Sequence, residues 1–166
     1  MWIIFAIIAP VPVFHFWLHA LLPFWRRAPL LFYAWCGIIW AAAFWFFFEI
    51  NPRSPVLFSP NPWQANLGGA LVWIGFAAAI FSVLSLGPIR FFMWAVLRPL
   101  VAPRVRLGGI YRALPHPAYF GYIVVALGAL LQTGSLLSAL VLALQLTLTP
   151  IMIYFEEEEM KKRLDN

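Results

Sequence analysis

The sequence contains very few charged side chains. Of its 166 residues, 10% are Asp, Glu, Lys or Arg, whereas 64% are hydrophobic. A soluble domain of this length needs far more polar surface to cover its core, so the composition excludes an ordinary soluble protein. Residues 28–48, 67–87 and 117–155 carry no charge, and a helix of about 20 apolar residues crosses a bilayer. We therefore expect an all-α integral membrane protein that is surrounded by the lipid bilayer.

The motifs of several soluble chemistries are also absent. The single Cys36 cannot form an internal disulfide, and the sequence has neither a Cys-x-x-Cys pair nor a His-Glu-x-x-His motif. It also has no Gly-rich phosphate loop and no nucleophile elbow. We therefore expect no bound metal and no Rossmann-type cofactor site. The apolar N-terminal segment lacks a basic region and a small-residue cleavage site, which favours a first membrane span over a signal peptide.

The apolar runs predict about five transmembrane helices. We place these helices roughly at residues 2–24, 28–49, 66–87, 117–132 and 135–155. Pro10 and Pro12 are expected to bend the first of them. The segment 88–103 is apolar with two arginines and predicts a short interfacial or re-entrant helix, whereas the proline-rich segment 51–65 predicts an ordered outer loop.

The whole chain is interpreted as one transmembrane domain, residues 1–166. Residues 1–87 would supply three N-terminal spans, residues 88–116 a connection on the cytoplasmic side, and residues 117–166 a C-terminal helical hairpin with its extension. The sequence does not indicate an oligomeric state.

The basic residues alternate between connections. Arg53 is the one basic residue in the second connection, and the 132–135 turn has none; the other ten of the 11 follow the first, third and fifth predicted spans. The positive-inside rule then predicts an N-terminus outside and a C-terminus in the cytoplasm. This topology explains the net charge of +5 without a nucleic-acid partner.

The predicted hairpin joins two polar clusters that are distant in the sequence. Only the short turn "QTGS" separates its two helices, so their far ends must lie side by side. Small residues of the first helix are expected to let the second pack closely against it; these are Gly121, Ala126, Gly128 and Ala129. We therefore expect "GIYRALPHPAYFGY" (109–122) to lie near "EEEE" (156–159).

His116 lies between Pro115 and Pro117 at the start of the hairpin. The following proline predicts extended backbone at His116 and a helix that begins at about Pro117. The free N–H groups of that helix start favour anionic groups. A second interpretation is a helix-start signal with a snorkelling histidine and interfacial tyrosines.

The acidic cluster also has two interpretations. Glu157, Glu158 and Glu159 each precede a basic residue by four positions, which is typical of a solvated, salt-bridged helix face. Glu156 has no such partner and could hold a ligand's ammonium or ribose hydroxyl groups. His15 and His19 share a helix face in the first span, and this spacing suits either interfacial packing or ligation of a metal or haem iron.

The two hairpin ends together resemble the isoprenylcysteine carboxyl methyltransferase family. Its signature G-x-Y-x-x-x-R-H-P-x-Y-x-G is matched at Gly109, Tyr111, His116, Pro117, Tyr119 and Gly121. Its E-E-x-x-L signature is similar to "EEEEMKKRLDN", with Glu156 and Glu157 as the acidic pair. Pro115 replaces the motif's arginine, and Asp165 stands where the family has glycine.

This resemblance implies a membrane methyltransferase that uses S-adenosylmethionine at the cytoplasmic membrane face. The cofactor-binding residues would be Gly109, Tyr111, His116, Pro117, Tyr119, Gly121, Glu156 and Glu157, and Arg112 would orient the nucleophile. The acceptor would be a lipophilic or small carboxylate, thiol or amine. The alternatives are a haem-binding membrane isomerase or nitrogen-oxide-related protein with ligands among His15, His19 and His116, and a non-catalytic scaffold.

Overall fold

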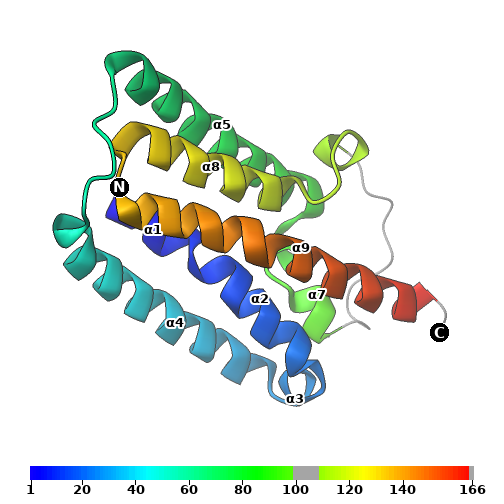
Figure 1. Cartoon of the computed structure of the whole chain (residues 1–166). Coiled ribbons are helices and arrows are strands. Elements are labelled where there is room, and N and C mark those ends of the chain that lie inside the picture. The colour runs from blue at the N-terminus through cyan, green and yellow to red at the C-terminus, as the bar shows by residue number, and fades with distance from the viewer. Residues whose placement is uncertain (99–108, 165–166) are drawn as a thin grey trace.

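The computed structural model describes residues 1–98 and 109–164, and the protein is 85% helical. Figure 1 shows the helices as α1 (Trp2–Ile8), α2 (Pro10–Ala20), α3 (Leu22–Arg27), α4 (Pro29–Ile50), η1 (Asn51–Arg53), α5 (Pro62–Leu86), α6 (Pro88–Phe91), α7 (Trp94–Leu97), η2 (Gly109–Arg112), α8 (Pro117–Thr133) and α9 (Leu136–Leu164). The expectation of an all-α membrane protein is confirmed.

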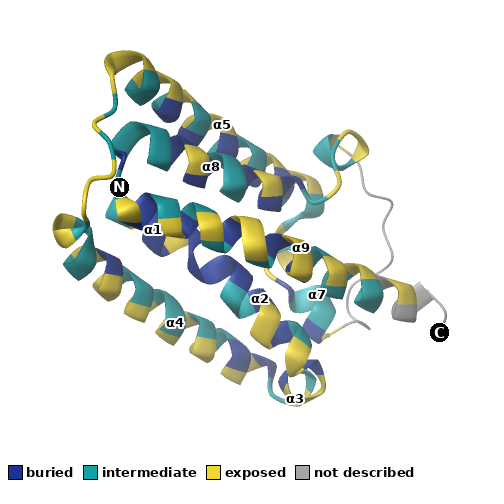
Figure 2. Cartoon of the chain, in the orientation of Figure 1, coloured by how far each residue is buried: buried dark blue, intermediate teal, exposed yellow. Residues whose placement is uncertain are grey.

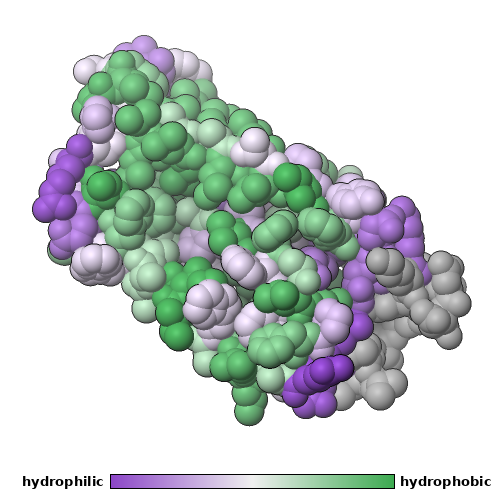
Figure 3. Space-filling model, turned by 60° about the horizontal axis from the view of Figure 1, so that its bottom comes forward, coloured by the Kyte–Doolittle hydropathy of each residue, from purple (hydrophilic) through white to green (hydrophobic). Residues whose placement is uncertain are grey.

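Within residues 1–98 and 109–164, four segments are long and apolar enough to cross a membrane. They are Trp2–Ala20, Pro29–Arg53, Pro62–Leu86 and Leu136–Glu159. The expected span at 117–132 corresponds to α8, which is shorter at 17 residues; at 1.5 Å per residue it measures about 25 Å, near the lower limit for a span. Figure 3 shows a mostly hydrophobic surface between hydrophilic residues at the two ends, as a lipid-embedded protein requires.

The first span is divided between α1 and α2 at its prolines. Pro12 has no N–H, so the carbonyl of Ile8 lacks its usual donor four residues later. Gln145 on α9 replaces that donor, because its Nε2 lies 2.7 Å from the Ile8 oxygen. The proline break therefore attaches the first span to α9.

Neighbouring helices lie in a row across the bundle. The order is α5, α8, α9, then α1 and α2, then α4, so that α4 and α5 lie at opposite edges although they are consecutive in sequence (Figure 1). Figure 2 shows that the outward face of α4 is largely exposed, which suits contact with lipid. The chain between these two edges must therefore cross the whole bundle.

The connection from α4 to α5 is ordered because it binds the α8–α9 turn. The N–H groups of Leu57 and Phe58 donate to the Gly134 carbonyl at 2.7 and 3.3 Å, and the Leu136 N–H donates to the Pro55 carbonyl at 2.8 Å. Gly134 has φ +57, and a Cβ there would collide with the Phe58 carbonyl. We call this the loop end (residues 51–61 and 133–135). The ordered loop expected at 51–65 is confirmed, although it is shorter than expected because α5 begins at Pro62. Asn61 and Gln64 form a capping box at this helix start.

The opposite end of the bundle is formed by α3, α6, α7, η2 and the C-terminal turns of α9. We call it the basic end, because it carries Arg26, Arg27, Arg90, Arg98, Arg112 and Lys161. Arg26 joins three elements there: its Nε donates to the Val96 carbonyl at 3.2 Å, and its Nη2 forms an ion pair with Glu159. The C-terminal helix α9 is thereby fixed to α3, which is in turn bound to α7.

The segment after α5 differs from the expected single interfacial helix. It forms the one-turn helices α6 and α7, which are separated by Met93 in the left-handed conformation (φ +63). Met93 and Leu97 are buried beside Leu18, Leu22 and Trp25, so burial of these side chains determines the break. The expected stops near Pro99 and Pro103 lie outside the described residues.

Glycines of α8 pack against α5, and not against α9 as the sequence suggested. A Cβ on Gly121 would lie 2.6 Å from the Gly75 oxygen, and one on Gly128 would lie 2.6 Å from the Gly68 oxygen. These pairs make α5 and α8 antiparallel, with backbones in direct contact. Ala126 and Ala129 behave as expected, because they lie in the core with Leu137 and Val141 of α9.

We predict that Gly128→Ala destabilises the protein in detergent by roughly 1–3 kcal/mol, because the added methyl group meets backbone atoms that cannot move aside. The control is Gly37→Ala on α4, where a Cβ meets nothing within 4 Å; this change is expected to be neutral or stabilising. Thermal unfolding followed by circular dichroism measures both. Equal melting temperatures for the two variants would contradict the close α5–α8 contact.

Candidate functional site

The site begins at the first residue of α8. The helix starts at Pro117, as expected, and the buried ring of Pro117 occupies its first position. His116, however, is not extended: it adopts the left-handed conformation with φ +53 and ψ +50. Histidine visits this region more readily than most residues, though at a cost in strain. The contacts that the ring makes in this conformation outweigh the local preference set by Pro117.

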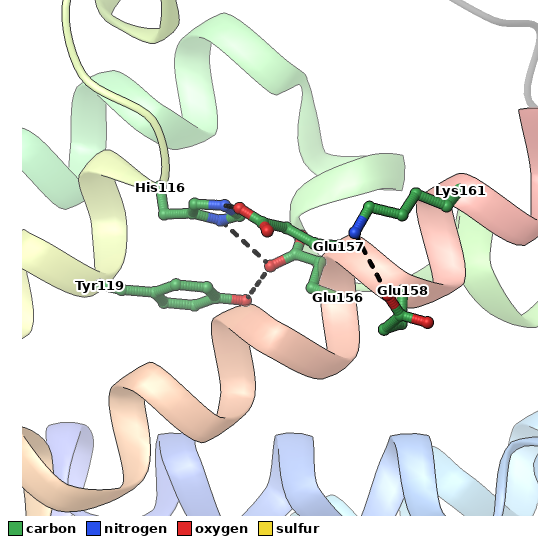
Figure 4. A network of polar contacts seen from close by, with 6 residues as sticks. All are labelled: His116, Tyr119, Glu156, Glu157, Glu158 and Lys161. Atoms are coloured by element: carbon green, nitrogen blue, oxygen red, sulfur yellow. Dashed lines mark hydrogen bonds and ion pairs between the residues drawn. The ribbon is translucent and has the colours of Figure 1, made fainter.

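His116, Tyr119 and Glu156 form one hydrogen-bonded network, shown in Figure 4. The Tyr119 hydroxyl donates to Glu156 Oε2 at 2.9 Å, and His116 Nδ1 lies 3.3 Å from the same oxygen. The two rings are stacked, with centroids 5.6 Å apart and planes 7° from parallel. The expected proximity of the two hairpin ends is thus confirmed. Because Tyr119 and His116 both contact Oε2, the other carboxylate oxygen of Glu156, Oε1, has no hydrogen bond among the described residues.

Glu157 and Glu158 play different parts in the acidic cluster. Glu157 Oε1 lies 3.7 Å from His116 Nε2, so His116 is positioned between two carboxylates. Glu158 instead pairs with Lys161 at 3.2 Å on the exposed side of the helix. The salt-bridged face that was one interpretation of this segment therefore accounts for Glu158, whereas Glu156 and Glu157 belong to the His116 network (Figure 4).

The network carries more negative than positive charge. The hydrogen bond to Glu156 raises the pKa of His116 above its ordinary value of 6.5, burial opposes this, and the charge of Glu157 adds to it. Even with His116 protonated, the carboxylates of Glu156 and Glu157 exceed it in charge. Since Pro115 stands where the family signature has arginine, the site lacks a compensating cation at that position, and it suits a cationic ligand.

Gly109 and Tyr111 lie against the last turns of α5. Gly109 has φ +59, and a Cβ there would lie 2.6 Å from Ser85 Oγ, so only glycine fits this contact. The Tyr111 hydroxyl bonds to the side chain of Ser82, and burial raises the pKa of Tyr111 to about 12. Tyr111 is close enough to Glu156 to interact with its charge. No motif in the sequence indicated the contributions of Ser82 and Ser85.

The other predicted residues lie farther from the network. Arg112 is exposed at the end of η2 and makes no hydrogen bond or ion pair with any residue that the structure describes. Gly121 is buried, and its closest neighbour is the backbone of Gly75 on α5. The structure thus brings together His116, Tyr119, Glu156 and Glu157, with Tyr111 near Glu156. It shows no contact of Gly109, Gly121 or Arg112 with these four residues within the part of the chain that it describes.

His15 on α2 also reaches the network. Its ring packs edge-to-face against Tyr119, with centroids 5.4 Å apart and planes at 85°, and the residue is 4% exposed. His15 therefore packs among aromatic rings, as one interpretation expected, and it does so inside the bundle. A histidine within an apolar span was the available signal, but its partner on α8 could not be inferred from the sequence.

The geometry gives little support to the haem alternative. His116 and His15 contact the same tyrosine, whereas the His19 ring stacks on Phe155, with centroids 6.3 Å apart. Within residues 1–98 and 109–164 there is no group of three or more His, Cys, Asp or Glu side chains placed to hold a metal.

A cavity of about 210 Å³ lies at the loop end, far from the His116–Glu156 network. Its lining residues are Trp2, Phe48, Glu49, Pro52 and Arg53.

Comparison with known families agrees with this geometry. A family model described as phospholipid methyltransferase matches residues 63–165, more than half of the chain and the whole of the predicted cofactor site. No curated protein and no solved structure matches the chain. The matched family includes the isoprenylcysteine carboxyl methyltransferase-like membrane enzymes, which confirms the resemblance of the two hairpin motifs. The chain belongs to the phospholipid methyltransferase family of membrane methyltransferases.

Proposed function

We propose that the protein transfers a methyl group from S-adenosylmethionine to a lipophilic or small amine, thiol or carboxylate acceptor at the cytoplasmic face of the membrane. The observation that carries this proposal is the Glu156 carboxylate on α9, held by Tyr119 and His116 at the start of α8. Family membership supports methyltransferase activity in general, and members of this family generally use S-adenosylmethionine.

The side chains of the network fit the chemical groups of this cofactor. S-Adenosylmethionine carries a sulfonium, an ammonium and two ribose hydroxyls, all of which a carboxylate attracts or accepts from. Glu156 Oε1 is the free acceptor, while Oε2 is occupied by Tyr119 and His116. The Tyr119 ring beside this carboxylate is an aromatic group of the kind that a cation can contact. Glu156, Glu157, His116 and Tyr119 would therefore hold the cofactor, and Tyr111 would border it.

When bound, S-adenosylmethionine supplies an electrophilic methyl group on a positively charged sulfur. The protein's contribution is then mainly to bind and orient both reactants away from water, which can supply most of the rate enhancement. Tyr119 and His116 fix the direction of the Glu156 carboxylate, and Glu156 fixes the ligand. Such a site needs few ionisable groups, as in this chain.

The orientation in the membrane is part of the proposal. The basic end carries nearly all of the cationic side chains and also the His116–Glu156 network, whereas the loop end has Arg53 as its basic residue. By the positive-inside rule, the basic end faces the cytoplasm. A water-soluble cofactor then reaches the network from the cytoplasm, and a lipophilic acceptor reaches it from the bilayer.

We predict that the detergent-purified protein binds S-adenosylhomocysteine, measured by calorimetric titration. Glu156→Gln and His116→Ala are expected to weaken binding roughly ten- to hundred-fold, because each removes a charge-assisted contact of the network. Glu158→Gln is the matched control, since Glu158 pairs with Lys161 outside the network. This variant is expected to bind as the wild type does.

Equal affinity of all three variants would place the cofactor elsewhere in the protein. Failure of the wild type to bind would remove S-adenosylmethionine from the proposal. A Soret band in the absorption spectrum of the purified protein would instead favour the haem-binding alternative.

We predict that the network stabilises the protein more at pH 6 than at pH 9. Folding raises the pKa of His116, so the native state binds more protons than the unfolded state above pH 6.5. The stability that the His116–Glu156 pair contributes is fully present below the ordinary pKa of histidine. It is lost as the pH rises through the raised pKa of His116 in the folded protein. The melting temperature of the wild type minus that of His116→Asn should therefore decrease from pH 6 to pH 9. A difference that is constant or increases would contradict the His116–Glu156 ion pair.

The proposed orientation can be measured by cysteine labelling. Cys36 is the single cysteine, so Cys36→Ser provides a background without thiols. In intact cells, a membrane-impermeant maleimide is expected to label Ser59→Cys at the loop end. It should label Lys161→Cys at the basic end only after the cells are permeabilised. The reverse pattern would show that the network faces outward.

A further inference from the structure

His15 has a nitrogen atom with no role in the fold. Its Nδ1 lies 2.9 Å from the Val11 carbonyl, which can only accept, so Nδ1 carries the hydrogen of that bond. In the neutral ring, Nε2 then presents a lone pair. This atom is buried and has no hydrogen-bond partner in the described part of the chain. A buried acceptor left without a donor destabilises the fold, and a bound donor would offset this cost.

Two further polar atoms on α9 share this property. Thr149 Oγ1 and Gln145 Oε1 are buried and have no hydrogen bond to any described residue. Gln145 contacts Ile8 of α1, and Glu156 lies eleven residues farther along α9, about 16 Å. The part of α9 from Gln145 toward Glu156 therefore carries buried polar atoms that have no partner among the described residues.

His15 is placed to act on a ligand at the Glu156 network. Its ring touches Tyr119, whose hydroxyl binds Glu156, and the Glu156 carboxylate is close enough to interact electrostatically with the imidazole. The other titratable group facing His15 is His19, one turn along α2. His15 also precedes residues 63–165, the part of the chain that matches the family model, so that match gives His15 no role.

We propose that His15 belongs to the methyl-acceptor site and that its Nε2 accepts a hydrogen bond from the attacking group. The acceptor must then carry an N–H, S–H or O–H group, because the lone pair of Nε2 repels a carboxylate. This inference rests on the proposed methyltransferase function and narrows its acceptor class.

For an alkylamine, the ammonium ion first loses one proton to water, which leaves a lone pair on nitrogen. A remaining N–H donates a hydrogen bond to His15 Nε2 and directs that lone pair toward the methyl group. The N–C bond would form as the C–S bond breaks, with the C–S electron pair staying on sulfur and the positive charge passing to the methylated nitrogen.

The test uses full-length protein in detergent and two ligands with the same chain and charge. Octylamine has N–H donors, whereas octyltrimethylammonium has none. His15→Asn retains an amide donor that can reach the Val11 carbonyl but has no counterpart of Nε2. His19→Asn is the matched control on the same helix. Affinities are measured by calorimetry with and without S-adenosylhomocysteine.

The wild type and His19→Asn are expected to bind octylamine about ten-fold more tightly than octyltrimethylammonium, and His15→Asn should lose this preference. With S-adenosylmethionine, His15→Asn should methylate octylamine about ten-fold more slowly than the wild type at both pH 7 and pH 9, because the attacking nitrogen is no longer oriented by a hydrogen bond. Octanoate should not be methylated by the wild type.

Three results would overturn the role of His15. They are equal affinities of the wild type for both ligands, an unchanged preference in His15→Asn, and methylation of octanoate. Absence of S-adenosylhomocysteine binding by the wild type would reject the proposed function alone, since the comparison of the two octyl ligands would still decide whether His15 binds a donor.

Discussion

A carboxylate at the edge of an apolar environment must find partners within the protein, and Glu156 finds them in Tyr119 and His116. Much of the surrounding structure serves this arrangement. The α8–α9 turn brings the two helices together, the left-handed backbone of His116 directs its ring, and the Arg26–Glu159 pair fixes the next turn of α9. The same contacts that satisfy the carboxylate leave one of its oxygens for a ligand.

Backbone contacts determine how closely the helices approach. Gly68 and Gly75 on α5 face Gly128 and Gly121 on α8, so the two helices touch without side chains between them. This close approach holds the start of α8 against the end of α5, where Ser82 and Ser85 receive Tyr111 and Gly109. In a lipid environment, where apolar side chains gain little from burial, such packing is a principal source of helix association.

Features governed by local rules could be predicted from the sequence. Apolar length gave the spans, the short 132–135 turn gave the hairpin, and the hairpin gave the proximity of His116 to Glu156. Features governed by distant partners could not. Nothing in α8 indicates that its glycines face α5, and the rule for residues before proline fails at His116 because stacking on Tyr119 outweighs it. His15 was visible as a polar residue in a span, but its neighbour was not.

The row of helices has one more consequence. The family match covers α5, α8 and α9, which carry the carboxylate and its ring partners, whereas α2 borders them from the segment before it. The N-terminal helices therefore meet the matched helices along a broad contact, which includes His15 against Tyr119, Ile8 against Gln145 and Arg26 against Glu159. In the proposed function, a substitution on the α2 face beside Tyr119 would alter the acceptor site without changing any residue that contacts Glu156 through a hydrogen bond.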